Sequence, residues 1–353
     1  MAMSSRGTKT GVLLINLGTP DTPSVSDVRK YLREFLMDRR VIDIPYINRF
    51  FLINLIIAPF RAPKSSKVYK ELWDEKGSPL CYYGYEVKKL LQEQLGKNYQ
   101  VEIGMRYQNP SIESALNEFR GKALDKLIII PLFPQYASAT TGSAIEKTME
   151  ILSKWEIIPD VKIVSNFPNH PLFIKAFAEI GRKYMEKEDY DHFLFTYHGL
   201  PERQIAKASI QNYCQLNDKC CSKYHAKNKY CYRAQCYETT RALVAELQIP
   251  ADKYTIAFQS RMLKDPWIRP YTDDVIKELA KQGKKKILTF SPSFIADCLE
   301  TTIEGGEEYK ELFKQCGGER WQLVESLNTH ETWIECLKDM VLSNCNEVVE
   351  SYK

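Results

Sequence analysis

The sequence predicts an α/β protein made of two Rossmann-like domains, each with a four-stranded parallel sheet flanked by helices. Short β-branched and apolar runs recur along the 353 residues, with helix-like segments between them. This pattern is typical of buried parallel strands in βαβ units. A chain of this length also exceeds the size at which a single hydrophobic core usually stops growing. Two similar doubly wound domains satisfy both observations.

Eight runs are the candidate strands, four in each half of the chain. In the first half they cover residues 11–18, 100–107, 126–134 and 161–167. In the second half they cover residues 192–199, 254–260, 285–292 and 321–328. Ligands of open α/β sheets bind beyond the carboxyl ends of the strands, so we expect the loops after these runs to share one face or cleft.

The segment NFPNHP, which ends at Pro171, interrupts the strand and helix pattern and predicts the joint between the domains. We therefore expect an N-terminal domain over residues 1–170. The C-terminal domain is expected over residues 171–330, with a cysteine-rich insert at 207–236. A last helix-like segment, residues 331–353, is predicted to pack back on the N-terminal domain.

Charge and hydropathy limit the possible partners. The 49 basic and 45 acidic residues give a net charge of +4, too mild to indicate a nucleic-acid partner. The short polar start MAMSSRGTKT does not resemble a secretion signal, and the longest apolar stretch, RFFLINLIIAPFRAP, is too short to span a bilayer. We expect a cytoplasmic protein. Residues 50–60 are either a peripheral contact with the inner face of the cytoplasmic membrane or a segment packed on the core.

His198 is the first candidate for chemistry. It ends the apolar run of FTYHGLPER, and Gly199 and Pro201 turn the chain at once, so its imidazole can project into the crevice between the domains. A single histidine is more often structural than catalytic. Its position at the carboxyl end of a strand favours a functional role.

A line of carboxylates follows the seventh candidate strand. If the segment is an α-helix from about Ile295, then Asp297, Glu300, Glu304 and Glu308 fall on one face. A solvated acidic face is the ordinary interpretation of such a run. A histidine that faces a carboxylate-lined helix is also suited to binding a divalent metal and to moving protons. The pair His198 and Glu300 is therefore the central hypothesis.

Cations in the first half of the chain could hold an acidic substrate. Arg61 and Lys64 lie in one motif, and Arg106 with Tyr107 ends the second candidate strand. Guanidinium and ammonium groups bind carboxylates well. The alternative is that all four are surface charges and strand-end polar groups.

Five of the ten cysteines crowd into 23 residues. They are Cys214, Cys220, Cys221, Cys231 and Cys236, with spacing C-x5-C-C-x9-C-x4-C. A zinc ribbon is disfavoured because there is no CxxC pair, whereas four thiolates can hold a [2Fe-2S] cluster. Seven basic residues against one acidic between Arg203 and Arg233 would favour thiolates and an anionic cluster. Free thiols are the alternative.

Seven motifs in order resemble those of the ferrochelatases, enzymes that insert ferrous iron into a porphyrin at the end of haem synthesis. The resemblance runs from about Gly11 to about Leu337. The motifs are LINLGTPD, RAPKSSKVYKELWDEKGSPL, GMRYQNPSI, PLFPQYASATTGS, YHGLPER, FQSRMLKDPWIRPYTD and SPSFIADCLETTIE. Each is weak alone, but all seven in order are highly specific.

The resemblance implies chelatase-type Rossmann-like halves around a porphyrin-sized cleft, with Fe(II) and protoporphyrin IX as substrates. It places the family's catalytic and metal-binding residues at His198 and Glu300, and an acidic path for metal or protons at Asp297, Glu304 and Glu308. Around the macrocycle it places Leu17, Arg61, Lys64, Tyr107, Ser260 and Trp267, to which Arg106 is added from the residue pattern. Alternatives are a coproporphyrin ferrochelatase and a non-catalytic tetrapyrrole or iron-sulfur binding protein.

The chain departs from some family members at two places. Cys298 stands where some members have a second histidine, so a role for that imidazole is not transferred. The cysteine insert resembles that of a bacterial subgroup that holds a [2Fe-2S] cluster inside the chain. The ligands expected from this resemblance are Cys214, one of Cys220 and Cys221, Cys231, and Cys236.

Overall fold

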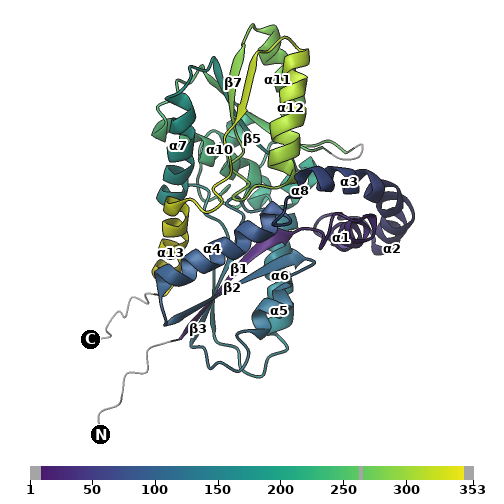
Figure 1. Ribbon diagram of the computed structural model, residues 1–353, viewed down its shortest axis with the longest axis vertical. Helices are drawn as coiled ribbons and strands as arrows, with labels where there is room; N and C mark the ends of the chain where they lie inside the picture. The colour runs from purple at the N-terminus through teal and green to yellow at the C-terminus, as the bar shows by residue number, and fades with distance from the viewer. Residues whose placement is uncertain (1–8, 262–264, 346–353) are drawn as a thin grey trace.

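The computed structural model describes residues 9–261 and 265–345, so the expectations for 1–8, for 346–353 and for residues 262–264 of the sixth motif lie outside the described residues. Two four-stranded parallel sheets form the framework (Figure 1). The first, in the order β2-β1-β3-β4, consists of β1 (Thr10–Gly18), β2 (Tyr99–Tyr107), β3 (Lys126–Pro131) and β4 (Asp160–Ile163). The second, in the order β6-β5-β7-β8, consists of β5 (His192–His198), β6 (Tyr254–Gln259), β7 (Lys286–Phe290) and β8 (Arg320–Leu323). The predicted fold class is confirmed.

The edge strands β4 and β8 are shorter than the apolar runs that predicted them. Phe167 and Leu327 follow these strands, outside the ladders, and are 4% and 1% exposed. Their apolar character comes from packing into the core from the connecting segments rather than from strand pairing. Hydropathy alone cannot distinguish these two kinds of burial.

Helices cover both sheets. In the first half they are α1 (Val25–Met37), α2 (Tyr46–Phe51), the π-helix η1 (Leu52–Ile57), α3 (Ala58–Leu72), α4 (Pro79–Leu95), α5 (Ile112–Asn117), the π-helix η2 (Ser138–Gly142) and α6 (Ser143–Leu152). In the second half they are α7 (Pro171–Met185), α8 (Glu202–Lys207), the 3-10 helix η3 (Ile210–Asn212), α9 (Asp218–Cys221), α10 (Tyr232–Glu246), α11 (Thr272–Lys281), the π-helix η4 (Glu300–Glu308), α12 (Tyr309–Gln315) and α13 (Glu331–Cys345).

One hydrophobic core continues from the first sheet into the second. It contains Val12 of β1, Phe195 of β5 and Trp333 of α13, all fully buried. Helix α13 packs against α7 and also against α4 and β3 of the first half. The chain therefore returns to the first sheet after completing the second.

The strand order identifies the sheet edge at which a ligand is expected in the second half. Strands β5 and β7 are neighbours, and the connection after β5 runs to β6 on one side whereas the connection after β7 runs to β8 on the other. Such a topological switch point opens a crevice at the carboxyl ends of the strands. His198 is the last residue of β5, and the segment after β7 leads to Glu300.

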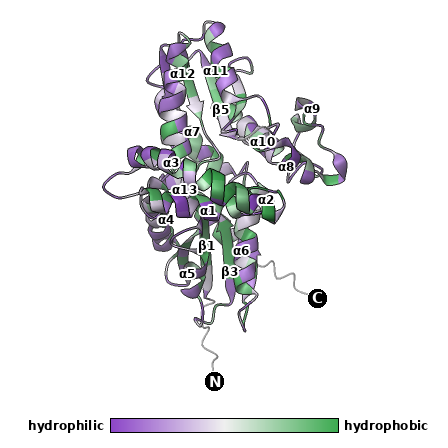
Figure 2. Ribbon diagram, turned by 90° about the vertical axis from the view of Figure 1, so that its right-hand side faces the viewer, coloured by the Kyte–Doolittle hydropathy of each residue, from purple (hydrophilic) through white to green (hydrophobic). Residues whose placement is uncertain are grey.

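Helices α1 to α3 form an excursion from the first sheet (Figure 1). One surface of this excursion, which we call the apolar lip, exposes Tyr46, Ile47, Phe50, Phe51, Leu55, Ile56 and Phe60. Figure 2 shows green, hydrophobic stretches of ribbon around α2. Within the described residues, none of the helices is both long enough and apolar enough to cross a bilayer.

Candidate functional site

His198 is half-buried and presents one ring nitrogen for chemistry. Its Nδ1–H donates to the carbonyl of Gly199 at 2.6 Å, since a carbonyl oxygen can only accept. In the neutral ring Nε2 then carries the lone pair, so this atom can accept a proton or bind a metal. The ring centroid lies 6.4 Å from that of Trp267. The imidazole is thus oriented by its backbone neighbour and bordered by an indole.

The backbone after His198 is held closely. Gly199 N–H donates to the carbonyl of Gln259 at 2.7 Å. A Cβ on Gly199 would lie 2.9 Å from that oxygen and 3.2 Å from the Trp267 ring, so only glycine fits without movement. On the other side, the Tyr232 hydroxyl donates to the carbonyl of His198 at 2.8 Å.

Glu300 begins a π-helix rather than lying inside an α-helix. The expectation of an α-helix from about Ile295 is wrong: η4 covers Glu300–Glu308, and its i→i+5 bonding ends with Tyr309 N–H on the carbonyl of Glu304. The paired glycines allow this wider turn, and Trp321 Nε1 donates to the carbonyl of Gly305 at 2.8 Å. π-Helical turns are rare and occur frequently at functional sites.

Helix η4, which begins with Glu300, contacts α3 of the first half of the molecule. Burial raises the pKa values of Tyr31 in α1 and Tyr69 in α3, and the negative charge of Glu300 raises both further. The two phenol rings meet edge to face with centroids 6.3 Å apart. Glu300 therefore connects the second sheet electrostatically with the excursion that also carries the apolar lip.

The four predicted carboxylates do not form one continuous line. Glu304 shares η4 with Glu300 and accepts hydrogen bonds from Ser260 Oγ at 2.5 Å and Tyr309 Oη at 2.8 Å. Glu308 lies further along η4 and is exposed. Asp297 lies before the helix, outside the predicted face.

Asp297 instead stabilises the connection between β8 and α13. Its carboxylate accepts from the backbone N–H of Ser326 at 3.1 Å and from Asn328 Nδ2 at 2.7 Å. Both acceptor oxygens are thus used by neighbouring loop residues. This placement gives Asp297 a bracing role that helical periodicity could not predict.

Gln259 is a site residue that sequence reasoning missed. It pairs with His198 in the ladder between β5 and β6, and its Nε2 donates to the carbonyl of Glu300 at 3.3 Å and to Glu304 Oε2 at 3.4 Å. Thr196 Oγ1 donates to its Oε1 at 3.0 Å. The available signal was its position at the end of a buried strand, the same signal that indicated His198.

Arg106 and Tyr107 are bound to other protein groups. Arg106 forms an ion pair with Asp38 at 2.7 Å and donates to Ser143 Oγ at 2.6 Å. The Tyr107 hydroxyl donates to Asp38 Oδ2 at 2.9 Å, and its side chain is fully buried. Although burial opposes it, hydrogen bonding from Ser143, assisted by Arg106, lowers the pKa of Asp38. The sequence predicted that Tyr107 contacts the substrate, but its side chain has no accessible surface in this structure.

The remaining predicted porphyrin contacts lie on both halves. Leu17 at the end of β1 is half-buried against the hydrophobic cluster that contains Tyr107, and Arg61 and Lys64 are exposed on α3. Ser260 follows β6, and Trp267 forms a bridge with Pro201. Each lies at or after a strand's carboxyl end or on the α1–α3 excursion.

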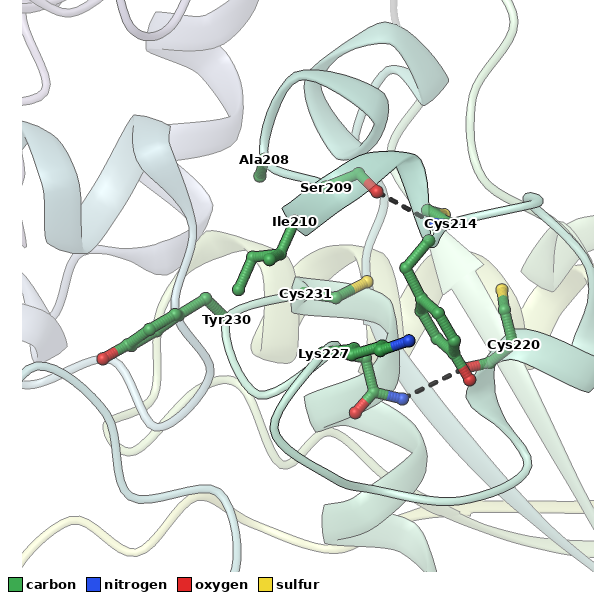
Figure 3. Close-up of a pocket in the computed structure, with 10 residues that line it drawn as sticks. Ala208, Ser209, Ile210, Cys214, Cys220, Lys227, Tyr230 and Cys231 are labelled. Atoms are coloured by element: carbon green, nitrogen blue, oxygen red, sulfur yellow. Dashed lines mark hydrogen bonds between the residues drawn. The ribbon is translucent and has the colours of Figure 1, made fainter.

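Three of the five clustered cysteines line a small pocket, and Cys221 lies next to them. Figure 3 shows Cys214, Cys220 and Cys231 among its lining residues. Cys220 Sγ lies 3.9 Å from Cys221 Sγ, and Cys231 hydrogen-bonds with both Cys214 and Cys221. Cys236 is fully buried and lies beside Tyr232 instead. The grouping thus differs from the expected ligand set by including both adjacent cysteines and omitting Cys236.

Two of these cysteines have lowered pKa values. Hydrogen bonding from the single Cys231 S–H, which can reach only one partner at a time, is the first cause that lowers the pKa of Cys214 and of Cys221, each to about 6. Arg233 also donates to Cys221 Sγ at 3.3 Å. All ten cysteines are free thiols. In the described parts of the chain, no group of three or more His, Cys, Asp or Glu side chains already has the arrangement of a metal site.

The chain resembles known proteins over almost its whole length. The family model described as Ferrochelatase matches residues 9–345. A ferrochelatase from Legionella pneumophila (strain Lens) is 48% identical over 331 residues, covering 94% of this chain and 98% of the relative. A ferrochelatase from Coxiella burnetii (strain Dugway 5J108-111) is 42% identical over 332 residues, covering 94% and 93%.

A solved structure, SirB from Bacillus subtilis with Fe3+, has a similar fold. The TM-score is 0.52 at 10% identity, and the match covers 95% of each chain. At this identity the likeness concerns the fold alone.

Proposed function

The chain belongs to the ferrochelatase family and is a porphyrin metal chelatase that inserts ferrous iron, and we propose that it forms protohaem from protoporphyrin IX at a site built on His198 and Glu300. The observation that carries this proposal is the position of both residues at the switch point of the second sheet, linked by Gln259. The reaction exchanges two pyrrole protons for one Fe(II).

His198 Nε2 supplies a lone pair for this exchange. This lone pair accepts a pyrrole proton, contacts the iron, or does both in turn, and Glu300 shares these tasks. Glu304 and Glu308 extend from Glu300 along η4 as an outward route for protons or metal. Asp297 contributes to this route only indirectly, because its carboxylate stabilises the loop between β8 and α13.

The porphyrin is held between the two halves. Leu17 and Trp267 form apolar walls that bend the ring, so that its nitrogen lone pairs point out of plane. Arg61 and Lys64 bind the propionates from α3, and Ser260 assists from β6. Arg106 and Tyr107 act on the porphyrin indirectly, by holding Asp38 at the end of α1.

An anaerobic assay with Fe(II) and porphyrin tests the activity. The purified protein should convert protoporphyrin IX to a product with a haem spectrum. A non-catalytic tetrapyrrole-binding protein would instead bind the porphyrin, measured by fluorescence, without forming haem. Protoporphyrin is proposed because the motifs look closer to those of Gram-negative members and Leu17 stands where coproporphyrin-type members tend to have tyrosine. A higher kcat/KM for coproporphyrin would contradict this choice.

A second proposal concerns the cysteine pocket, where we infer a [2Fe-2S] cluster held by Cys214, Cys220, Cys221 and Cys231. Its support is the gathering of these four sulfurs, the low pKa values of two of them, and the nearby Arg233 guanidinium. Thiolates are the usual ligands of such clusters, and positive charge stabilises the anionic group. Cys236 is omitted because it lies beside Tyr232 in the core.

Absorbance spectroscopy tests this ligand set. Protein purified anaerobically should show the visible bands of an iron-sulfur cluster, with about two irons and two sulfides per chain. Cys214→Ser should lose them, and Cys236→Ser should keep them. Loss of colour in both Cys214→Ser and Cys236→Ser would instead support the set expected from the sequence. A cluster that cycled during turnover would indicate a redox role instead of a structural one.

We further propose that the apolar lip rests on the inner face of the cytoplasmic membrane. Its seven exposed apolar side chains lie on the excursion whose α3 also carries Arg61 and Lys64. An exposed patch of this kind indicates a protein or membrane contact, and the low solubility of porphyrins favours the membrane. The reduced cysteines fit a cytoplasmic location.

A further inference from the structure

The hydroxyl of Tyr232 contacts the backbone of His198. Tyr232 is the first residue of α10 and is 7% exposed. Its hydroxyl donates to the carbonyl of His198 at 2.8 Å and lies 3.3 Å from Ser293 Oγ, in the segment that leads from β7 to Glu300. One buried phenol therefore touches the approaches to both proposed catalytic residues.

The peptide plane between His198 and Gly199 is held on two edges. The carbonyl of His198 binds Tyr232 from α10, and the N–H of Gly199 binds the carbonyl of Gln259 from β6. Because a peptide group is planar, two bonds from opposite sides fix its rotation. The ring of His198 depends on this geometry, since its Nδ1 donates to the next carbonyl, that of Gly199.

Hydrogen bonds hold helix α10, which carries this tyrosine, in place. Gln235 Oε1 accepts from the backbone N–H of Tyr136 at 2.5 Å, and Thr239 donates to the carbonyl of Pro168 at 2.6 Å. These bonds attach α10 to the first half of the chain. At its start, Cys231 is the N-cap, and its carbonyl accepts from Gln235 N–H at 3.0 Å.

We propose that Tyr232 is a positioning residue for iron insertion, through which the cysteine-rich insert determines the orientation of His198. The inference rests on the proposed role of His198. Tyr232 does not touch substrate; it holds the peptide plane that aims Nε2. The insert enters this arrangement because Cys231, a wall of the cysteine pocket, is covalently joined to Tyr232 and begins the same helix.

Replacement Tyr232→Phe removes the hydroxyl and keeps the ring. We expect kcat to fall roughly tenfold, as for one lost hydrogen bond that acts in the transition state, with KM for porphyrin changed less than about twofold. The matched control is Tyr197→Phe. Tyr197 is fully buried next to His198, and its hydroxyl binds Thr240 on the same helix at 2.7 Å. This control should lower stability similarly and leave kcat unchanged.

Histidine-selective ¹⁵N NMR gives a readout independent of activity. In Tyr232→Phe the ring signals of His198 should shift or broaden, whereas those of His192, at the other end of β5, should not. Unchanged His198 signals, or a kcat equal to that of Tyr197→Phe, would overturn the proposal. If His198→Ala itself retains activity, the proposed role of His198 fails, and the NMR result still decides whether Tyr232 positions the ring.

Discussion

Gln259 lies opposite His198 in the ladder of β5 and β6, and its side chain donates to the carbonyl of Glu300. One amide thereby joins the strand that ends in the candidate base to the π-helix that begins with the candidate carboxylate. The two proposed catalytic residues come from segments about a hundred residues apart in the chain. Their relative position depends on this link and on the order of the strands.

Replacement of His198 by alanine should abolish iron insertion. Loss of a positioned proton acceptor costs about 10²–10⁴-fold in rate, and porphyrin binding should persist because the apolar walls remain. The measurements are anaerobic haem formation and porphyrin fluorescence titration. His192→Gln is the control, since His192 starts the same strand and bonds to Thr255 at 2.9 Å. Turnover near the parental level in His198→Ala would remove His198 from the chemistry.

Glu300→Gln should impair catalysis, whereas Asp297→Asn should impair stability. The first removes the charge that faces Tyr31 and Tyr69, so kcat should fall severely with little change in stability. The second disturbs the bonds to Ser326 and Asn328, and should lower the free energy of unfolding by about 1–3 kcal/mol. Steady-state kinetics and urea unfolding distinguish them. A pure change of porphyrin affinity in Glu300→Gln would contradict its proposed role.

Stability should decrease in mild acid because of His192. Burial lowers the pKa of this histidine to about 4, compared with an ordinary value of 6.5. Between these values the unfolded chain binds a proton that the folded protein does not, so its contribution to stability is full above pH 6.5 and is lost as the pH falls toward 4. The loss approaches about 3 kcal/mol. Urea unfolding at pH 7.5 and 4.5 should show a smaller decrease for His192→Gln; an equal decrease in both proteins would assign the effect to other groups.

Polar replacements on the apolar lip should weaken membrane binding. Phe60 is 74% exposed within the lip, whereas Ile157 is 84% exposed outside it. Co-sedimentation with anionic vesicles should decrease for Ile47→Ser/Phe60→Ser and stay unchanged for Ile157→Ser. Haem formation in detergent should be similar for all three proteins. Equal vesicle binding by the lip variant and the parent would show that the lip contacts something other than lipid.

Much of the fold and of the family assignment could be predicted because both depend on local patterns. Eight apolar runs separated by helical segments predicted the two parallel sheets, and seven ordered motifs indicated the ferrochelatase family. The π-helix η4 could not be predicted, since α-helical and π-helical turns place residues four apart on similar faces. The bracing role of Asp297 was also hidden, because its partners lie about 30 residues later.

The sequence by itself determined which residues end the strands and which chemical groups are present: an imidazole at position 198, a carboxylate at 300 and a group of thiols between 214 and 236. Only the tertiary structure decided which of these groups meet. It joined His198 to Gln259 and Tyr232, directed Asp297 to Ser326 and Asn328, and placed Cys236 beside Tyr232. The physical reason is that parallel strands and their crossovers bring together atoms from distant segments, whereas periodicity reports only the neighbours within one element.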